Sequence, residues 1–259
     1  MGKLDGRVAL VTGGGRGIGR AIALGFAGEG CTVAVSSRTL PELEAVAAEI
    51  DAAGGKGLAV KADAMSYEEI KASVQKVVAE FGTIHILANV AGGVLLAETP
   101  EGLSSVGHED QAFIDNLSLN LISAQRACRE VLPHMAKQQY GRIINIGSGY
   151  AKRGGGLISY TAAKHGIVGL TRAMATEVTE LGITVNCLCP GWTNTQLSRW
   201  GFDLQGEGAE AARIAAASEN IQNRLLEPEE LAPMAVLLAA EHSYGITGQV
   251  ISVDGGYRV

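Results

Sequence analysis

Short runs of β-branched and apolar residues alternate with helix-patterned segments along the chain, and this alternation restricts the fold more than any other feature. The runs are almost continuously apolar, as in strands that are covered on both faces. The segments between them repeat apolar residues at helical spacing. Such alternation is typical of βαβ units around a parallel sheet. We expect strands at 8–12, 32–36, 58–61, 84–88, 142–146, 183–187 and 249–253.

The helical segments have clear apolar faces. One face carries Leu43, Val46, Ala47 and Ile50. Another follows a predicted capping box, in which Ser66 and Glu69 start a helix; its face is Ile70, Val74, Val77, Val78 and Phe81. Because no linker, repeat or charge block divides the chain, we expect one doubly wound α/β domain over residues 1–259. Its seven-stranded, mainly parallel sheet should have helices on both faces, and the irregular stretch 192–227 should form a substrate lid.

Composition and charge exclude several classes of protein. The 259 residues are 47% hydrophobic, which suits a well-packed globule, and 21 basic against 27 acidic side chains give a net charge of −6. An acidic chain offers no footprint for a nucleic-acid backbone. No run approaches the roughly 18 apolar residues of a membrane span, so we expect a cytoplasmic protein. We expect no metal, and reduced, mostly buried thiols at Cys31, Cys128, Cys187 and Cys189.

A glycine-rich loop follows the first predicted strand and leads into a helix expected at 20–29. Glycines there let the backbone turn sharply and approach a pyrophosphate, while the helix N-terminus offers amide donors. The alternative is that these glycines serve only to make a tight turn that needs positive φ. With a strand before it and a helix after it, the loop predicts a dinucleotide site made by Gly13, Gly15, Arg16, Gly17, Ile18 and Gly19.

The end of the second strand indicates which dinucleotide binds. An NAD site would place an acidic side chain there for the ribose hydroxyl, but the sequence has Ser37 and Arg38. Arg38 can pair with a 2′-phosphate, and Arg16 adds a second positive charge. We therefore expect NADP(H) to be preferred, with NAD(H) possible. The alternative is that Arg38 is an ordinary solvated side chain.

The fifth predicted strand is followed by side chains that suit acid–base chemistry. Ser148 comes just after it, and Tyr160 and Lys164 stand at i and i+4 on a predicted helix, hence on one face. The phenol of an unperturbed tyrosine has a pKa of about 10, and an ammonium beside it favours the phenolate form. We expect Lys164 to lower the pKa of Tyr160 so that Tyr160 serves as a general acid or base.

With these motifs the chain resembles the short-chain dehydrogenase/reductase family, in particular its 3-oxoacyl-reductase-like members, from about Lys3 to Gly256. The resemblance implies a Rossmann fold and a catalytic Asn120 beside Ser148, Tyr160 and Lys164. An asparagine at position 89 matches the one that steadies the central sheet. Further cofactor contacts implied by the resemblance are Asp63, Ala64, Asn89, Ala91, Gly92, Tyr160, Lys164, Pro190, Gly191, Thr193 and Thr195. A turn-forming Asp63 is the alternative at that position.

The resemblance also implies hydride transfer between the nicotinamide and a ketone or secondary alcohol. Tyr160 would exchange the proton, Ser148 would hydrogen-bond the same oxygen, and Lys164 would grip the nicotinamide ribose. Asn120 would hold a water in a proton relay. Relatives usually form homotetramers through helices that here correspond to 115–132 and 160–181. The second has a ridge that could serve the core or a partner, formed by Ile167, Leu170, Met174 and Val178.

The substrate is less constrained. We expect its pocket to lie between segments 93–99, 149–158 and 192–227, whose apolar character favours a medium-sized carbonyl compound. Lys152 and Arg153 leave open an anionic or thioester substrate, as in 3-oxoacyl reductases and 3-hydroxy acid dehydrogenases. The residues assigned to the pocket are Gly93, Ser148, Tyr150, Trp192, Leu197 and Trp200.

Two rival functions share parts of this pattern. A serine hydrolase would need Gly-x-Ser-x-Gly around Ser148, but Ile146 and Tyr150 occupy the outer positions. A non-catalytic NADP(H)-binding sensor could use the same fold. Because every expected catalytic position holds a suitable side chain, we expect an enzyme.

Overall fold

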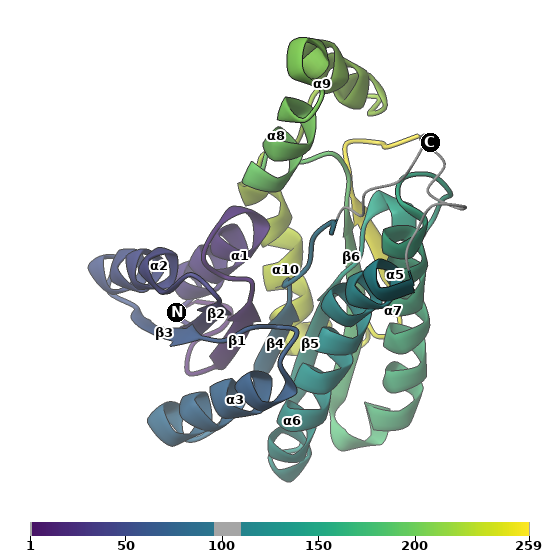
Figure 1. Cartoon of the computed structure of the whole chain (residues 1–259). Helices are drawn as coiled ribbons and strands as arrows, with labels where there is room; N and C mark the ends of the chain where they lie inside the picture. The colour runs from purple at the N-terminus through teal and green to yellow at the C-terminus, as the bar shows by residue number, and fades with distance from the viewer. Residues whose placement is uncertain (1, 96–109, 259) are drawn as a thin grey trace.

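The computed structural model describes residues 2–95 and 110–258, and these contain a seven-stranded parallel sheet (Figure 1). The strand order is β3-β2-β1-β4-β5-β6-β7, and every adjacent pair is parallel. This is the doubly wound order, in which the chain reverses direction across the sheet beside β1. The strands are β1 (Val8–Thr12), β2 (Thr32–Ser37), β3 (Lys56–Lys61), β4 (Ile86–Asn89), β5 (Gly141–Ile146), β6 (Ile183–Pro190) and β7 (Val250–Val253).

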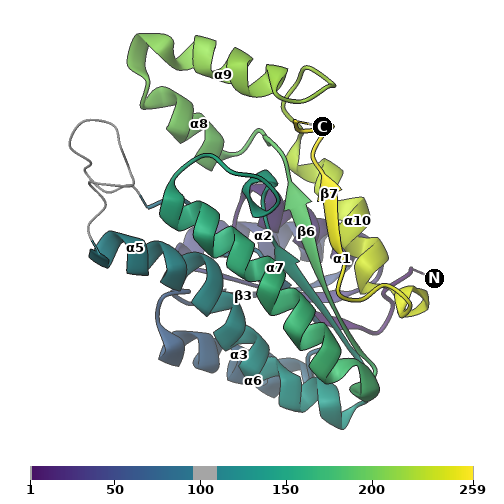
Figure 2. The same ribbon diagram turned by 90° about the vertical axis from the view of Figure 1, so that its right-hand side faces the viewer.

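Helices cover both faces of the sheet, as expected (Figure 1). One face carries α1 (Gly17–Gly28), α2 (Leu40–Ala52) and α10 (Ala232–Ala239). The other carries α3 (Tyr67–Phe81), α6 (Ser123–Lys137) and α7 (Ile158–Val178). A further helix, α5 (Asp110–Leu117), runs through a π-helical turn at Ser118–Ile122 into α6. Beyond the carboxyl ends of the strands project α8 (Gln196–Asp203) and α9 (Ala209–Ser218), which Figure 2 shows from the side.

The apolar strands supply two cores, one on each face of the sheet. Along β1, Ala9 and Val11 pack toward α1, α2 and α10, while Val8 and Leu10 pack toward α3, α6 and α7. Successive side chains of a strand point to opposite faces, so a strand buried on both sides must be apolar throughout. This explains why the strands could be located from sequence.

Several boundaries differ from the sequence-based expectation. β4 begins at Ile86 rather than at position 84, because the ring Nδ1 of His85 accepts the hydrogen bond of Val8 N. β3 begins two residues earlier than expected, and β6 extends to Pro190. The helix expected at 115–132 runs from Asp110 to Lys137 with a π turn inside it.

The predicted capping box of α3 forms only in part. The Ser66 hydroxyl accepts from Glu69 N at 3.3 Å, as predicted. The Glu69 carboxylate, however, accepts from Asp63 N at 2.9 Å and not from the N-cap. It thereby fixes the turn after β3, where Asp63 is placed.

Packing answers the question that the sequence left open about the apolar ridge of α7. The ridge of α7 serves the core, since Ile167, Met174 and Val178 are buried and Leu170 packs against them.

The segment 192–227, expected to be irregular, is largely helical because it contains α8 and α9. All four cysteines are buried free thiols. Across 2–95 and 110–258, no helix has the length and apolar character needed to span a membrane.

Candidate active site

A large cavity of about 960 Å³ lies at the carboxyl ends of the strands. It extends from Arg38 and Asp63, past the glycine loop, to Ser148 and Tyr160, and then under α8 and α9. Its size is near the top of the ~300–1,000 Å³ range usual for ligand pockets. Every residue that the sequence assigned to cofactor or substrate lines it, whereas Asn120 does not.

The glycine loop is shaped by close backbone packing. Gly13 and Gly17 have φ of +66° and +52°, which side chains rarely tolerate. A Cβ on Gly13 would stand 2.8 Å from Ala91 N, and one on Gly19 would stand 2.1 Å from Gly13 O. The loop therefore has no room for side chains where it meets the 91–92 segment and the start of α1.

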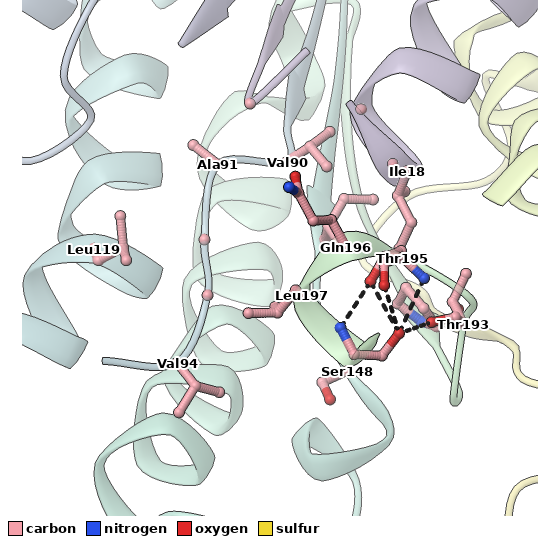
Figure 3. A pocket seen from close by; sticks show the side chains of 18 of the residues that line it. Ile18, Val90, Ala91, Val94, Leu119, Ser148, Thr193, Thr195, Gln196 and Leu197 are labelled. Carbon is pink, nitrogen blue, oxygen red and sulfur yellow. Dashed lines mark hydrogen bonds between the residues drawn. The ribbon is translucent and has the colours of Figure 1, made fainter. Parts of the chain in front are cut away.

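The N-terminus of α1 suits an anion. No side chain caps it, and its first turn contains no acidic residue. Unsatisfied amides and the helix dipole make such an end attractive to phosphate. Together with the glycine-lined cavity, the residues present fit the pyrophosphate of a dinucleotide. Figure 3 shows Ile18 at this end, above Thr195 and Gln196.

The adenosine end is more mixed in charge than the sequence indicated. Arg38 is exposed and pairs with no carboxylate among the described residues. Arg16, expected to add positive charge, instead contacts Glu42 at 3.4 Å and hydrogen-bonds Gln196 Oε1. Glu42 comes from α2 and lines the cavity, so a carboxylate stands near this site although none is present at the end of β2 itself. Asp63 both lines the cavity and makes a turn, accepting from Met65 N at 2.9 Å.

The ends of β1, β4 and β5 are tied together by polar side chains. Asn89 Nδ2 donates to Asn145 Oδ1 at 2.9 Å and to the thiol of Cys128. Thr12 Oγ1 accepts from Val90 N and from the amide of the next residue. Because these side chains are buried or half-buried between strands, they fix the floor of the cavity beneath the glycine loop.

Tyr160 and Lys164 lie on one face of α7, as their spacing requires. Lys164 Nζ donates to Ile146 O at 2.9 Å and stands 5.5 Å from the centre of the Tyr160 ring. Burial lowers the pKa of Lys164 to about 8. Burial also raises the pKa of Tyr160, although its hydrogen bond with Ser148 acts in the opposite direction. The pKa of Tyr160 is thus raised and not lowered as expected, because desolvation by burial is the largest influence on it.

Asn120 sits in the π turn between α5 and α6. Its Oδ1 accepts from Gly93 N at 3.0 Å, and its Nδ2 donates to Gly93 O at 2.8 Å and to Asn116 O at 3.1 Å. Both amide hydrogens are therefore used, and one lone pair of the oxygen remains. The side chain holds the Gly93 wall of the cavity in place, which leaves it little capacity for the water relay that the resemblance implied.

The segment after β6 lies beside the glycine loop. Thr193 Oγ1 donates to Gly191 O at 3.0 Å, and a Cβ on Gly17 would stand 3.4 Å from Thr195 Cγ2. Thr195 also caps α8, since its hydroxyl accepts from Ser198 N at 3.2 Å (Figure 3). Its capping bond therefore fixes where α8 starts relative to the cofactor end.

The substrate end is built from aromatic and apolar side chains. Trp192 stacks near Phe202 with ring centres 5.8 Å apart, and Tyr150 meets Tyr160 edge-on at 6.4 Å. Leu197 points from α8 toward the strand-like segment that carries Ala91 and Val94 (Figure 3). Of the predicted wall 93–99, positions 96–99 lie outside the described residues.

Two predicted cations are not at this end of the cavity. Lys152 and Arg153 do not line it, and Lys152 Nζ donates to Ser252 Oγ at 2.8 Å. Two lining residues that the sequence analysis did not name are Tyr257, which lies outside the predicted walls, and Glu219, which lies within the predicted wall 192–227. An aromatic residue directly after the paired glycines was the available signal for Tyr257. Nothing local marks Glu219.

Within the described ranges, no cluster of three or more His, Cys, Asp or Glu side chains is arranged to hold a metal ion. Of the five histidines in the sequence, His108 lies outside those ranges.

Comparisons with known proteins agree with this geometry. The pattern of the short chain dehydrogenase family matches residues 7–202. The chain is 37% identical to the "Short-chain reductase protein NovJ" of Streptomyces niveus, over 96% of this chain and 93% of that protein. It is also 37% identical to the 3-oxoacyl-[acyl-carrier-protein] reductase FabG of Vibrio harveyi, over 98% of each.

A solved structure gives the same result in three dimensions. A variant of actinorhodin polyketide ketoreductase, determined with NADPH, superposes with a TM-score of 0.89 at 33% identity, covering 100% of this chain and 99% of that one. Matches of this extent in sequence and fold accompany the glycine loop and the Ser148–Tyr160–Lys164 cluster found in the cavity. The chain therefore belongs to the short-chain dehydrogenase/reductase family and is an NAD(P)-dependent oxidoreductase, similar to 3-oxoacyl reductases.

Proposed function

We propose that this protein is an NADP(H)-preferring oxidoreductase that interconverts a ketone and a secondary alcohol, with Tyr160 as its general acid or base. One observation carries the proposal: Ser148, Tyr160 and Lys164 line the same continuous cavity as the glycine loop. A dinucleotide seated along this cavity would bring its nicotinamide toward the phenol. Bound there, the nicotinamide would supply or accept the hydride.

The chain's own residues would handle the substrate oxygen. Tyr160 donates its proton to that oxygen in reduction and takes it back in oxidation. The Ser148 hydroxyl hydrogen-bonds the same oxygen and stabilises its developing negative charge. Lys164, held by Ile146 O, presents a buried ammonium to the ribose and to the phenol. Since burial raises the pKa of Tyr160, the phenol stays protonated at neutral pH, which suits it as the acid in reduction.

Asn120 takes a positioning role in this proposal. Its amide holds both backbone groups of Gly93, which line the cavity next to the catalytic side chains. A Cβ on the neighbouring Gly92 would stand 2.8 Å from Asn120 Oδ1 and 3.4 Å from Lys164 Nζ. Asn120 thus sits behind the catalytic lysine, where its last lone pair is the acceptor left for a proton relay.

The preference for NADP(H) rests on Arg38, an unpaired guanidinium at the end of β2. Guanidinium groups bind phosphate by paired hydrogen bonds. The Glu42 carboxylate would repel a phosphate, but the Arg16 guanidinium, 3.4 Å away, is positioned to neutralise it. We therefore expect NADPH to be favoured over NADH, with NADH still accepted.

For the substrate we propose a medium-sized, largely apolar carbonyl compound, held beneath α8 and α9 acting as a lid. Leu197, Trp200 and Phe202 supply the apolar surface. A 3-oxoacyl thioester is the alternative, favoured by the likeness to FabG proteins of several bacteria. The placement of Lys152 and Arg153 outside the cavity argues against it, because they offer no cation to a carrier phosphate.

A spectrophotometric assay tests the proposal. NADPH consumption is followed with a panel of cyclic, aromatic and aliphatic ketones and with 3-oxoacyl thioesters. We expect turnover with apolar ketones and a higher kcat/KM with NADPH than with NADH. Tight NADPH binding without turnover of any compound would contradict the proposal and favour a non-catalytic sensor.

A further inference from the structure

One wall of the substrate pocket contains a buried phenol, that of Tyr257. Tyr257 is 4% exposed, lines the cavity, and its hydroxyl makes no hydrogen bond within the described residues. Tyr150 and Glu219 stand near this hydroxyl, and the Tyr257 hydroxyl helps to lower the pKa of Glu219, but neither neighbour is in hydrogen-bonding geometry with it. A buried hydroxyl left unsatisfied costs about 1–3 kcal/mol, so a ligand group that pairs with it gains binding energy.

The ring of Tyr257 is held firmly in this position. Gly255 and Gly256 turn the chain with φ of +65° and +76°, and a backbone bridge joins Tyr257 to Asn220. The ring packs so closely on Gly149 that a Cβ there would stand 2.5 Å from it, and it meets Tyr150 edge-on at 6.3 Å. Because Tyr150 also meets Tyr160 edge-on, the three phenols form one contiguous aromatic group that connects Tyr257 to the reacting end.

The charged group that lines the cavity beside this phenol is the Glu219 carboxylate; the Arg258 guanidinium that pairs with it stands 5.5 Å from the centre of the Tyr257 ring and does not line the cavity. Glu219 lines the cavity, and its carboxylate accepts from Trp192 Nε1 at 2.7 Å and from Arg258. Burial raises the pKa of Glu219, but the hydrogen bonds from Arg258 and Trp192 outweigh burial, and the carboxyl is ionised. The cations Lys152 and Arg153 do not line the cavity. A substrate group that reaches this wall therefore meets a neutral phenol and a carboxylate.

We propose, as an extension of the proposed function, that Tyr257 is a specificity residue for a neutral substrate bearing a second polar group, a hydroxyl or a carbonyl, remote from the reacting carbonyl. The Tyr257 hydroxyl hydrogen-bonds that group, and Glu219 rejects an anion in its place. Trp192 and Arg258 are positioning residues that hold Glu219. The site thus selects hydroxyketones or diketones of extended shape over plain ketones and over keto acids.

Three matched probes test this subsite: 4-phenylbutan-2-one, its para-hydroxy derivative and its para-carboxy derivative. All share the reacting ketone and differ at the remote end. With the wild type we expect the hydroxy probe to exceed the plain ketone in kcat/KM by about 2–12-fold, the range of one neutral hydrogen bond. Tyr257→Phe should remove this preference, so that the hydroxy probe and the plain ketone have equal kcat/KM in the variant. Glu219→Gln should raise kcat/KM for the carboxy probe by about fivefold or more.

The control is Tyr244→Phe, which removes a phenol that donates to Thr179 O outside the cavity. It should leave all three probes unchanged. A preference that survives Tyr257→Phe, or a wild type without preference for the hydroxy probe, would overturn the proposal. Equal losses on all probes would also overturn it, since they would indicate a packing role for the ring.

Binding gives a second readout that does not depend on turnover. The dissociation constants of the probes from the NADP⁺ complex can be followed by tryptophan fluorescence, because Trp192 and Trp200 line the pocket. Hydroxyl-dependent binding that Tyr257→Phe removes, in the absence of turnover, would refute the proposed function and uphold the subsite. Turnover of the plain ketone without hydroxyl-dependent binding would uphold the proposed function and refute the subsite.

Discussion

The two ends of the cavity are built by different means. At the cofactor end, backbone groups and glycines at the ends of β1, β2 and β4 make the walls, and neighbours such as Asn89 and Lys164 are only 6% and 4% exposed. At the substrate end the walls are side chains from α8, α9 and the carboxyl-terminal segment, where Leu197 and Trp200 are 43% and 42% exposed. The first end tolerates almost no change of shape, whereas the second can vary residue by residue.

The strongest test of this contrast lies in the glycine loop. Gly19→Val would place a side chain against Gly13 O, where a Cβ would already stand at 2.1 Å. Because the obstacle is backbone, we expect the free energy of unfolding to fall by about 3 kcal/mol and NADPH binding to be lost. The matched control is Gly28→Ala at the other end of α1, where a Cβ meets nothing within 4 Å. Urea unfolding measures the stability of the two variants, and NADPH fluorescence measures their cofactor binding. Equal stability and equal NADPH affinity of the two variants would contradict the proposed rigidity of the cofactor end.

The charge of the adenosine end is tested by Arg38→Asp. Losing a charged hydrogen bond to phosphate should weaken NADPH binding by about 10–100-fold and leave NADH binding little changed. The kcat/KM ratio of the two cofactors measures it. Arg153→Asp, which makes the same change outside the cavity, serves as the control. If the cofactor ratio stays constant in Arg38→Asp, the 2′-phosphate is not bound there.

Burial of Lys164 predicts how stability depends on pH in the cofactor-free protein. Its folded pKa of about 8 lies below the unfolded value of 10.5. Between these values the unfolded chain binds more protons, so the contribution of Lys164 to the free energy of unfolding rises with pH. The raised pKa of Tyr160 keeps that group protonated over most of the same window.

The measurement compares the wild type with Lys164→Met by urea unfolding at about pH 7.5 and about pH 9.5. The stability of the wild type relative to the variant should increase by about 2 kcal/mol across this interval. A constant difference would show that the ammonium is solvated, and the cofactor end would then be less enclosed than described.

The smallest effects are expected at the substrate end. Leu197→Ala removes an exposed wall residue that touches no part of the sheet core. We expect KM for apolar ketones to rise about two- to fivefold, consistent with partial loss of one hydrophobic contact, while thermal stability and NADPH affinity stay unchanged. A large drop in stability would mean that α8 belongs to the rigid part of the molecule.

The same contrast explains what the sequence could reveal. The strands were located to within about three residues at either end, because burial on both faces forces apolar runs that are visible locally. The glycine loop and the Tyr160–Lys164 pair were also visible, since each depends on neighbours a few positions away. Every side chain assigned to the cofactor lines the cavity.

What escaped prediction depends on residues distant in sequence. Glu42 reaches Arg16 from α2, and Glu219 meets Arg258 through the turn after β7. The π turn that directs Asn120 to Gly93 depends on where α5 and α6 pack, which no local period reports. Likewise, the spacing of Tyr160 and Lys164 placed the two side chains on one face of a helix, but the rise in the pKa of Tyr160 that burial causes required the fold.

The role of Tyr160 is tested most directly by comparing two single-atom changes, Tyr160→Phe and Tyr150→Phe, whose rings lie 6.4 Å apart in the same cavity. The measurement is kcat for an apolar ketone together with the NADPH dissociation constant. We predict that Tyr160→Phe lowers kcat by about 10²–10⁴-fold with NADPH affinity nearly intact, while Tyr150→Phe changes kcat by less than about fivefold. A Tyr160→Phe enzyme with near-normal kcat, or a Tyr150→Phe enzyme that loses it, would contradict the assignment of the proton donor.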